Sequence, residues 1–148
     1  MRLARTRAHR ETSDIAGDNH EHRIRGMIAP NLCALLLEAA DFCAANLLDG
    51  VLYWHTPVLS RRELDAHLPL GTLPGIPHWT FIWSDAGRSK VAFINLVSTT
   101  GRPTAPQRMF AKKASFAGAT WHECRTIDNF VATLKRIGVP MRGERKAA

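Results

Sequence analysis

The sequence predicts a single α/β domain in which a mixed sheet is flanked by helices. Two segments space their apolar residues as a buried helix face does, two more carry helix-capping signals, and four short segments rich in β-branched and aromatic residues have the pattern of strands. These segments alternate as helix, strand, helix, strand, strand, helix, strand, helix, without an internal repeat. A chain of 148 residues suits one domain of this kind.

The two ends of the chain differ in composition from its middle. Residues 1–19 carry four arginines and too few apolar side chains to offset the entropy of ordering, which predicts a disordered basic arm. The folded domain is expected to span residues 20–140. Residues 141–148 are expected to form a basic tail.

Helix signals recur in four places. Apolar residues at steps of three and four predict a helix over residues 21–48, which Pro30 must interrupt because proline removes a backbone donor. Each of the other helices follows an N-terminal capping residue, and the last two also end at a glycine. They are expected after Ser60 (residues 61–68), between Thr104 and Gly118, and between Thr126 and Gly138.

Strands are expected at residues 51–55, 79–83, 90–97 and 119–124. Turn residues at positions 85–87 predict that the second and third strands form a hairpin at the centre of the sheet. The four tryptophans all fall in these strands, where core packing is the expected role rather than base stacking. They are Trp54, Trp79, Trp83 and Trp121.

Composition also limits the function. The formal charge of +7 and pI near 10.0 favour a polyanionic partner, nucleic acid first, although many small basic proteins bind nucleic acid only nonspecifically. Cys33, Cys43 and Cys124 lack metal-ligand spacing and are expected to be buried thiols. No apolar run approaches the roughly 20 residues of a membrane span, so a cytoplasmic protein without a membrane partner is expected.

One stretch resembles a known family. The loop Pro74-Gly75-Ile76-Pro77 precedes a strand and hairpin, and residues 92–107 read AFINLVSTTGRPTAPQ. This arrangement is similar to the VRR-NUC branch of the PD-(D/E)XK nucleases over residues 21–138. The resemblance implies a restriction-endonuclease-like fold, with a central mixed sheet flanked by helices, and a magnesium-dependent DNA endonuclease.

The departures from the family pattern fall on the catalytic positions. His78 replaces the metal-binding aspartate, Asn95 the glutamate and Val97 the lysine, and Glu21 matches the glutamate on the first helix. Magnesium prefers charged oxygen ligands, so its binding should be greatly weakened, with a weak metal site at Glu21 and His78. The leading hypothesis is a pseudonuclease without a tightly bound cofactor, which would use Mg²⁺ or Mn²⁺ only if it is active.

The resemblance also places the helix that follows the hairpin beside the nucleic-acid channel. Four cations and one amide are expected to contact DNA there, and branched DNA, which is associated with the family, is one candidate. These residues are Arg102, Gln107, Arg108, Lys112 and Lys113.

Two alternatives stay open. The first is an active metal-dependent endonuclease with a reduced site formed by Glu21, His78, Asn95 and a backbone carbonyl near Leu96. Candidates to replace its lysine are Lys90, Lys112 and Lys113, although nothing in their spacing requires it. The second is a protein-interaction module that kept only the fold. A homodimer is compatible with each of these functions.

Overall fold

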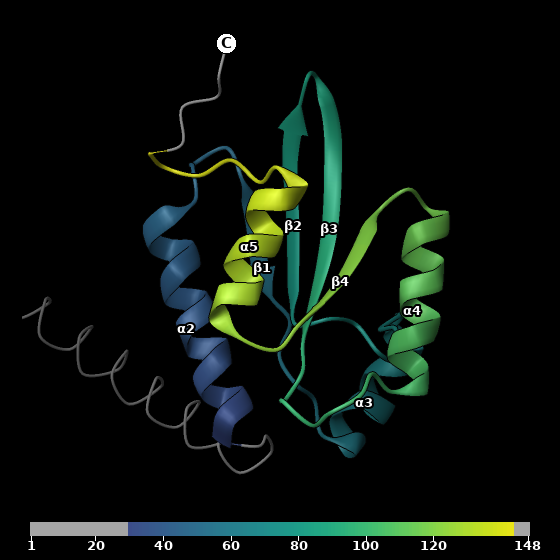
Figure 1. Ribbon diagram of the computed structural model, residues 1–148. Helices are drawn as coiled ribbons and strands as arrows, with labels where there is room; N and C mark the ends of the chain where they lie inside the picture. The colour runs from purple at the N-terminus through teal and green to yellow at the C-terminus, as the bar shows by residue number, and fades with distance from the viewer. Residues whose placement is uncertain (1–29, 144–148) are drawn as a thin grey trace, which may run out of the picture.

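The computed structural model describes residues 30–143 and confirms the predicted order of elements within them (Figure 1). The basic arm, Glu21 and the start of the first predicted helix lie outside the described residues. The elements are α2 (Pro30–Asn46), β1 (Leu52–His55), α3 (Arg61–His67), the 3-10 turn η1 (Leu68–Leu70), β2 (Trp79–Asp85), β3 (Arg88–Leu96), α4 (Ala105–Phe116), β4 (Thr120–Cys124) and α5 (Ile127–Ile137).

The sheet is mixed, as predicted, with the strand order β1-β2-β3-β4. Its two central strands form the predicted antiparallel hairpin, closed by Ala86 and Gly87, whose φ angles are both positive. Strand β4 runs parallel to β3. Strand β3 ends at Leu96, so Val97 lies just beyond the strand in which it was predicted.

The main core lies between the sheet and two helices. Helices α2 and α5 lie side by side over one sheet face (Figure 1). Phe81, Ile94, Phe130 and Leu134 are fully buried in that layer. Because side chains alternate across a strand, residues 78, 80, 93 and 95 face the opposite side.

Helix α4 covers part of this opposite face. The rings of Phe93 on β3 and Phe110 on α4 meet edge to face, with centroids 5.0 Å apart. The helix packs mainly against β3 and β4, and strand β1 at the far edge is left more open. Leu52 and Trp54 of β1 are 64% and 47% exposed, so the prediction that Trp54 is a core residue is wrong.

Capping explains where the later helices begin. The side-chain oxygens of Ser60, Thr104 and Thr126 each accept the backbone N–H of the residue three positions on, as the sequence predicted. All three cysteines are buried, which confirms that prediction. The fold also runs past residue 140, because the Arg142 N–H donates to the Asn46 carbonyl at 2.7 Å.

Gly75 lets the loop before β2 approach the start of α4. Its φ is +80°, and a Cβ placed on it would lie 2.4 Å from the Pro106 carbonyl carbon and 2.5 Å from the Gln107 nitrogen. Both are backbone atoms, which cannot move aside cheaply. The loop and α4 are therefore in backbone contact, a proximity that only glycine permits.

The substitution Gly75→Ala should lower the free energy of unfolding by about 2–5 kcal/mol, from left-handed strain and overpacking together. Gly71→Ala is the matched control, because Gly71 has φ +89° but a Cβ placed on it would meet nothing within 4 Å. It should cost only the strain, about 1–2 kcal/mol. Urea unfolding followed by tryptophan fluorescence measures both, and equal losses would show that the loop does not press on α4.

Candidate functional site

The structure brings three predicted site positions together on the α4 side of the sheet. Trp79 pairs with Ile94 across the hairpin, so His78 and Asn95 lie in the next register position, beyond the end of the assigned β2–β3 pairing. Gln107 reaches the same place from the first turn of α4. The family resemblance assigned His78 and Asn95 to the catalytic positions and Gln107 to DNA contact, and Glu21, another of the catalytic positions, lies outside the described residues.

Asn95 and Gln107 are joined by their side-chain amides. Asn95 is only 1% exposed, and its Oδ1 accepts a hydrogen bond from Gln107 Nε2 at 3.1 Å. The other end of the Gln107 amide, Oε1, accepts from the Thr104 N–H at 2.8 Å and completes a capping box. Gln107 thus satisfies a buried polar group and caps a helix at once, which is a structural task.

His78 is held as a neutral ring. Its Nδ1 accepts a hydrogen bond from the Leu96 N–H at 3.0 Å, so Nδ1 carries no proton and the ring proton resides on Nε2. Burial, aided by the nearby His55, lowers the pKa of His78 to about 4. The His55 ring lies nearly parallel to it, with centroids 6.4 Å apart.

This tautomer opposes a metal-ligand role for His78. Coordination through Nε2 would move the proton to Nδ1, where it would face the Leu96 N–H, donor against donor. Within residues 30–143, no group of three or more His, Cys, Asp or Glu side chains is placed to hold a metal ion. The weak metal site at Glu21 and His78 stays a prediction.

The lysine position of the family pattern is filled by packed methyl groups. Val97 is 7% exposed, and a Cβ placed on Gly101 would lie 3.0 Å from Val97 Cγ1. The Arg125 guanidinium closes this turn by donating to the carbonyls of Ser98 and Gly101, each at 2.8 Å. Arg125 does not take the place of the lysine, because its guanidinium is held by these carbonyls and by Glu123.

Glu123 and Arg125 are site residues that sequence reasoning missed. Glu123 pairs in register with Asn95 on the neighbouring strand, so its carboxylate is on the same sheet face. It forms an ion pair with Arg125. Their alternation across the end of β4 was a visible signal, but only the parallel pairing of β3 with β4 places them beside Asn95.

Lys90 cannot substitute for the missing lysine. It pairs with Trp83 five residues from Asn95 along β3, which is about 17 Å at the rise of a strand. Lys112 and Lys113 lie on the exposed surface of α4 rather than beside the buried amides. These three lysines therefore do not lie among His78, Asn95 and Val97.

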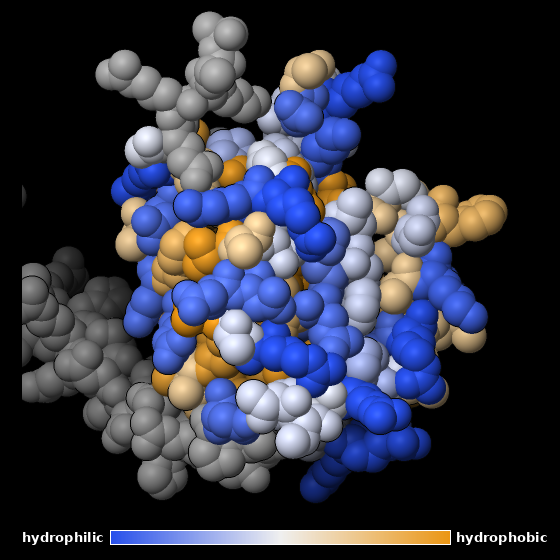
Figure 2. All heavy atoms as spheres, in the orientation of Figure 1, coloured by the Kyte–Doolittle hydropathy of each residue, from blue (hydrophilic) through white to orange (hydrophobic). Residues whose placement is uncertain are grey.

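The α4 side of the domain is basic. The sequence has no acidic residue between Asp85 and Glu123. Four of the six cations in that stretch belong to the connection before α4 or to α4 itself: Arg102, Arg108, Lys112 and Lys113. The other two, Arg88 and Lys90, alternate with the α4-facing positions of β3 and so lie on the other face of the sheet. Helix α2 in the other layer has Glu38 and Asp41 and no basic residue. Figure 2 shows hydrophilic side chains over much of α4, at the right of the view, next to hydrophobic ones.

A pocket of about 370 Å³ opens beside His78 and Gln107. Its wall comes from the segment after β1, the loop before β2 and the start of α4, and includes Thr56, Thr72 and Thr104. Every residue in the wall is uncharged when His78 is neutral. Within residues 30–143 the pocket therefore offers hydrogen bonds and apolar contacts, and none of these lining residues is a carboxylate that could bind a cation.

Comparisons of the chain with protein-family models, with curated proteins and with solved structures found no match. The described residues form a mixed α/β domain, and no helix among them is both long and apolar enough to cross a bilayer.

The ring of His78 should stay neutral at pH values well below 6.5, the ordinary pKa of a histidine. In ¹H–¹⁵N spectra of the imidazoles we expect bare Nδ1 and protonated Nε2 at pH 7, with titration near pH 4. The folded state binds this proton less readily than the unfolded state does. The neutral ring therefore contributes up to about 3 kcal/mol to the free energy of unfolding above pH 6.5, and this contribution is lost as the pH falls toward 4. His78→Asn keeps an acceptor for Leu96 and should flatten this pH dependence, whereas titration near 6.5 would contradict the assignment.

Gln107→Glu separates the two tasks of this side chain. A glutamate retains the capping box, but at pH 7 it has no donor for Asn95 Oδ1, so the free energy of unfolding should fall by about 1–3 kcal/mol. A protonated glutamate can donate again, so the deficit relative to wild type should shrink as the pH falls toward 4. Denaturation curves at several pH values test this, and an unchanged stability at pH 7 would show that Asn95 finds another donor.

Proposed function

We propose that the protein binds DNA on the side of the domain formed by β3, the connection to α4 and α4 itself. The observation that carries the proposal is the run of basic residues without an intervening acid, exposed on α4 at Arg108, Lys112 and Lys113. Exposed cations on one side attract the phosphates of DNA, and their binding releases counterions from the DNA. This attraction does not depend on the geometry of an active site. The resemblance to VRR-NUC proteins points to DNA, branched DNA included, as the polyanion.

The chemistry of the neighbouring site supports binding without efficient cleavage. Cleavage by a metal-activated water needs hard, charged ligands, whereas His78, Asn95 and Val97 supply an imidazole N–H, a bonded amide and methyl groups. The carboxylate beside Asn95 belongs to Glu123, which is paired with Arg125. The proposed function is therefore that of a nuclease-fold pseudoenzyme that holds DNA.

The logarithm of the DNA-binding constant should fall linearly with the logarithm of salt concentration. Phosphate contacts by Arg102, Arg108 and Lys112 give a slope of at least about −2.7 for duplex DNA. The double variant Arg108→Glu/Lys112→Glu should reduce the magnitude of that slope by about 1.8. Lys135→Glu, a charge reversal on α5, serves as the control and should leave the slope unchanged.

The measurement is fluorescence anisotropy with a labelled duplex and a labelled four-way junction at several salt concentrations. Parallel incubations with supercoiled plasmid contain Mg²⁺, Mn²⁺ or chelator, and the proposal expects no nicking beyond the chelator control. Chelator-sensitive nicking would support the rearranged endonuclease instead. Absence of binding to both DNAs at low salt would leave the interaction module as the better account.

A further inference from the structure

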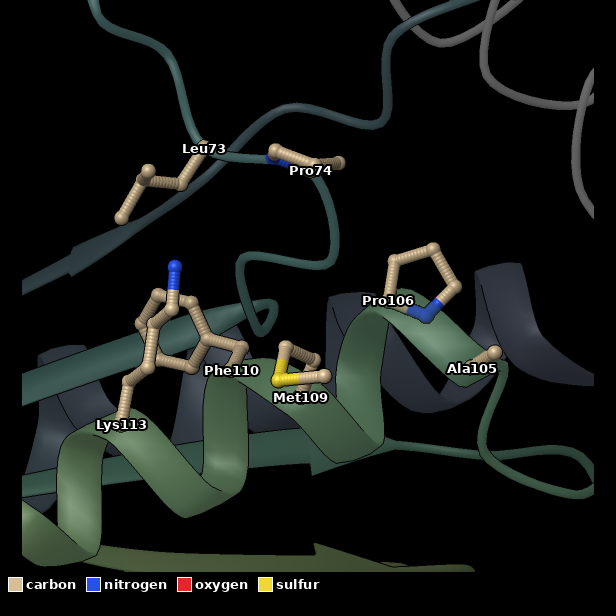
Figure 3. A pocket seen from close by; sticks show the side chains of 7 residues that line it. All are labelled: Leu73, Pro74, Ala105, Pro106, Met109, Phe110 and Lys113. Atoms are coloured by element: carbon tan, nitrogen blue, oxygen red, sulfur yellow. The ribbon is translucent and has the colours of Figure 1, made fainter.

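An apolar groove runs along one flank of α4. It has a volume of about 310 Å³ and separates the loop at Leu73 and Pro74 from the first half of the helix. Figure 3 shows side chains of α4 rising toward that loop. The groove is lined by Leu73, Pro74, Ala105, Pro106, Met109, Phe110 and Lys113, of which only Lys113 is charged.

Several bulky apolar side chains around the groove remain in water. Leu73 and Met109, on its two walls, are 47% and 54% exposed. Phe116, two turns beyond Met109 on the same side of α4, is 98% exposed and lines a second hollow with Lys112 and Lys113. Phosphate binding does not require such side chains, and clustered exposed apolar groups are typical of protein contact sites.

The charges around the groove define the complementary ligand. Helix α4 contains no acidic residue, and Lys113 lies within the groove wall with Lys112 beside it. A ligand that has acidic groups next to apolar ones would place its acids against these lysines and its apolar groups against the groove. A second copy of this chain is disfavoured as occupant, because each copy has a formal charge of +7.

We infer that this groove docks a short amphipathic segment of a partner protein, with bulky apolar side chains flanked by Asp or Glu. Such segments bind grooves of this kind through a few apolar anchors, and the flanking charges set orientation and specificity. The partner is thus a protein that presents an acidic, leucine- or aromatic-bearing peptide.

The groove and the proposed DNA surface are separate flanks of one helix. Successive helical residues are about 100° apart, so Met109 and Lys113 share one direction while Arg108 and Lys112 share another. The inference does not depend on DNA binding, and the two can fail independently. Lys113 borders both surfaces, which makes competition between peptide and DNA an expected consequence.

A random 12-residue peptide library displayed on phage tests the inference with the full-length protein immobilised. We expect enriched peptides to combine Leu, Phe, Trp or Met with an excess of Asp and Glu. One enriched peptide is then synthesised with a fluorescent label and titrated by anisotropy. A selection that enriches nothing, or that enriches basic or wholly polar peptides, overturns the inference.

Two neutral variants locate the binding. Leu73→Gln and Met109→Gln change the polarity of the groove without changing charge, and each should weaken the peptide about tenfold while leaving oligonucleotide affinity unchanged. Ser115→Gln, an exposed position on the opposite flank of α4, is the control and should change the affinity less than twofold. Lys113→Glu should weaken acidic peptides about tenfold.

The same titrations distinguish the occupants. If the glutamine variants bind the peptide as wild type does while circular dichroism shows them folded, the peptide does not use this groove. If instead they lose oligonucleotide affinity, the groove takes nucleic acid and the inference fails. Loss of DNA binding in Arg108→Glu/Lys112→Glu with the peptide affected far less would leave this inference standing beside the proposed function.

Discussion

The hydrogen bond between the side-chain amides of Gln107 and Asn95 fixes the relation of α4 to the sheet, and much of the functional side follows from it. Asn95 is buried in the central strand β3, so its oxygen needs a donor, and Gln107 supplies it from the first turn of the helix. Because the same side chain caps α4, the start of the helix and its contact with β3 are joined in one residue. Gly75 then allows the preceding loop to close against that first turn. The basic flank and the apolar groove are both consequences of where α4 is held.

The same bond helps to explain why the centre of the site offers no free charged ligand. A nuclease of the family that the sequence resembles needs carboxylates whose charge a metal ion compensates. Here the Asn95 oxygen is bound by an amide, and His78 Nδ1 is bound by a backbone N–H. The arrangement is complete without an ion, whereas a buried carboxylate at either position would cost several kcal/mol unless it was paired. Neutral groups that satisfy one another's hydrogen bonds make this centre a packing element.

Local signals in the sequence were sufficient for most of the fold. The caps at Ser60, Thr104 and Thr126 located three helices, and the turn at residues 85–87 located the central hairpin, because these features act within a few residues. Trp54 was misjudged because β1 is an edge strand, and exposure at an edge depends on what the rest of the chain covers. Glu123 and Arg125 were missed for a similar reason, since the pairing of β3 with β4 joins residues about 28 apart in sequence. Long-range pairing leaves little trace in one sequence.

The contrast between the centre and the surface of this side reflects the different requirements of catalysis and of binding. Catalysis depends on a few groups at fixed distances, so one neutral substitution at a ligand position removes a large share of the rate. Binding is distributed over exposed cations that each contribute modestly and independently, and α4 retains them. Its other flank exposes Met109 and Phe116, which neither the core nor phosphate binding requires. A helix with two such flanks can bring a polyanion and a partner protein to the same place, and that role requires no bond to be broken.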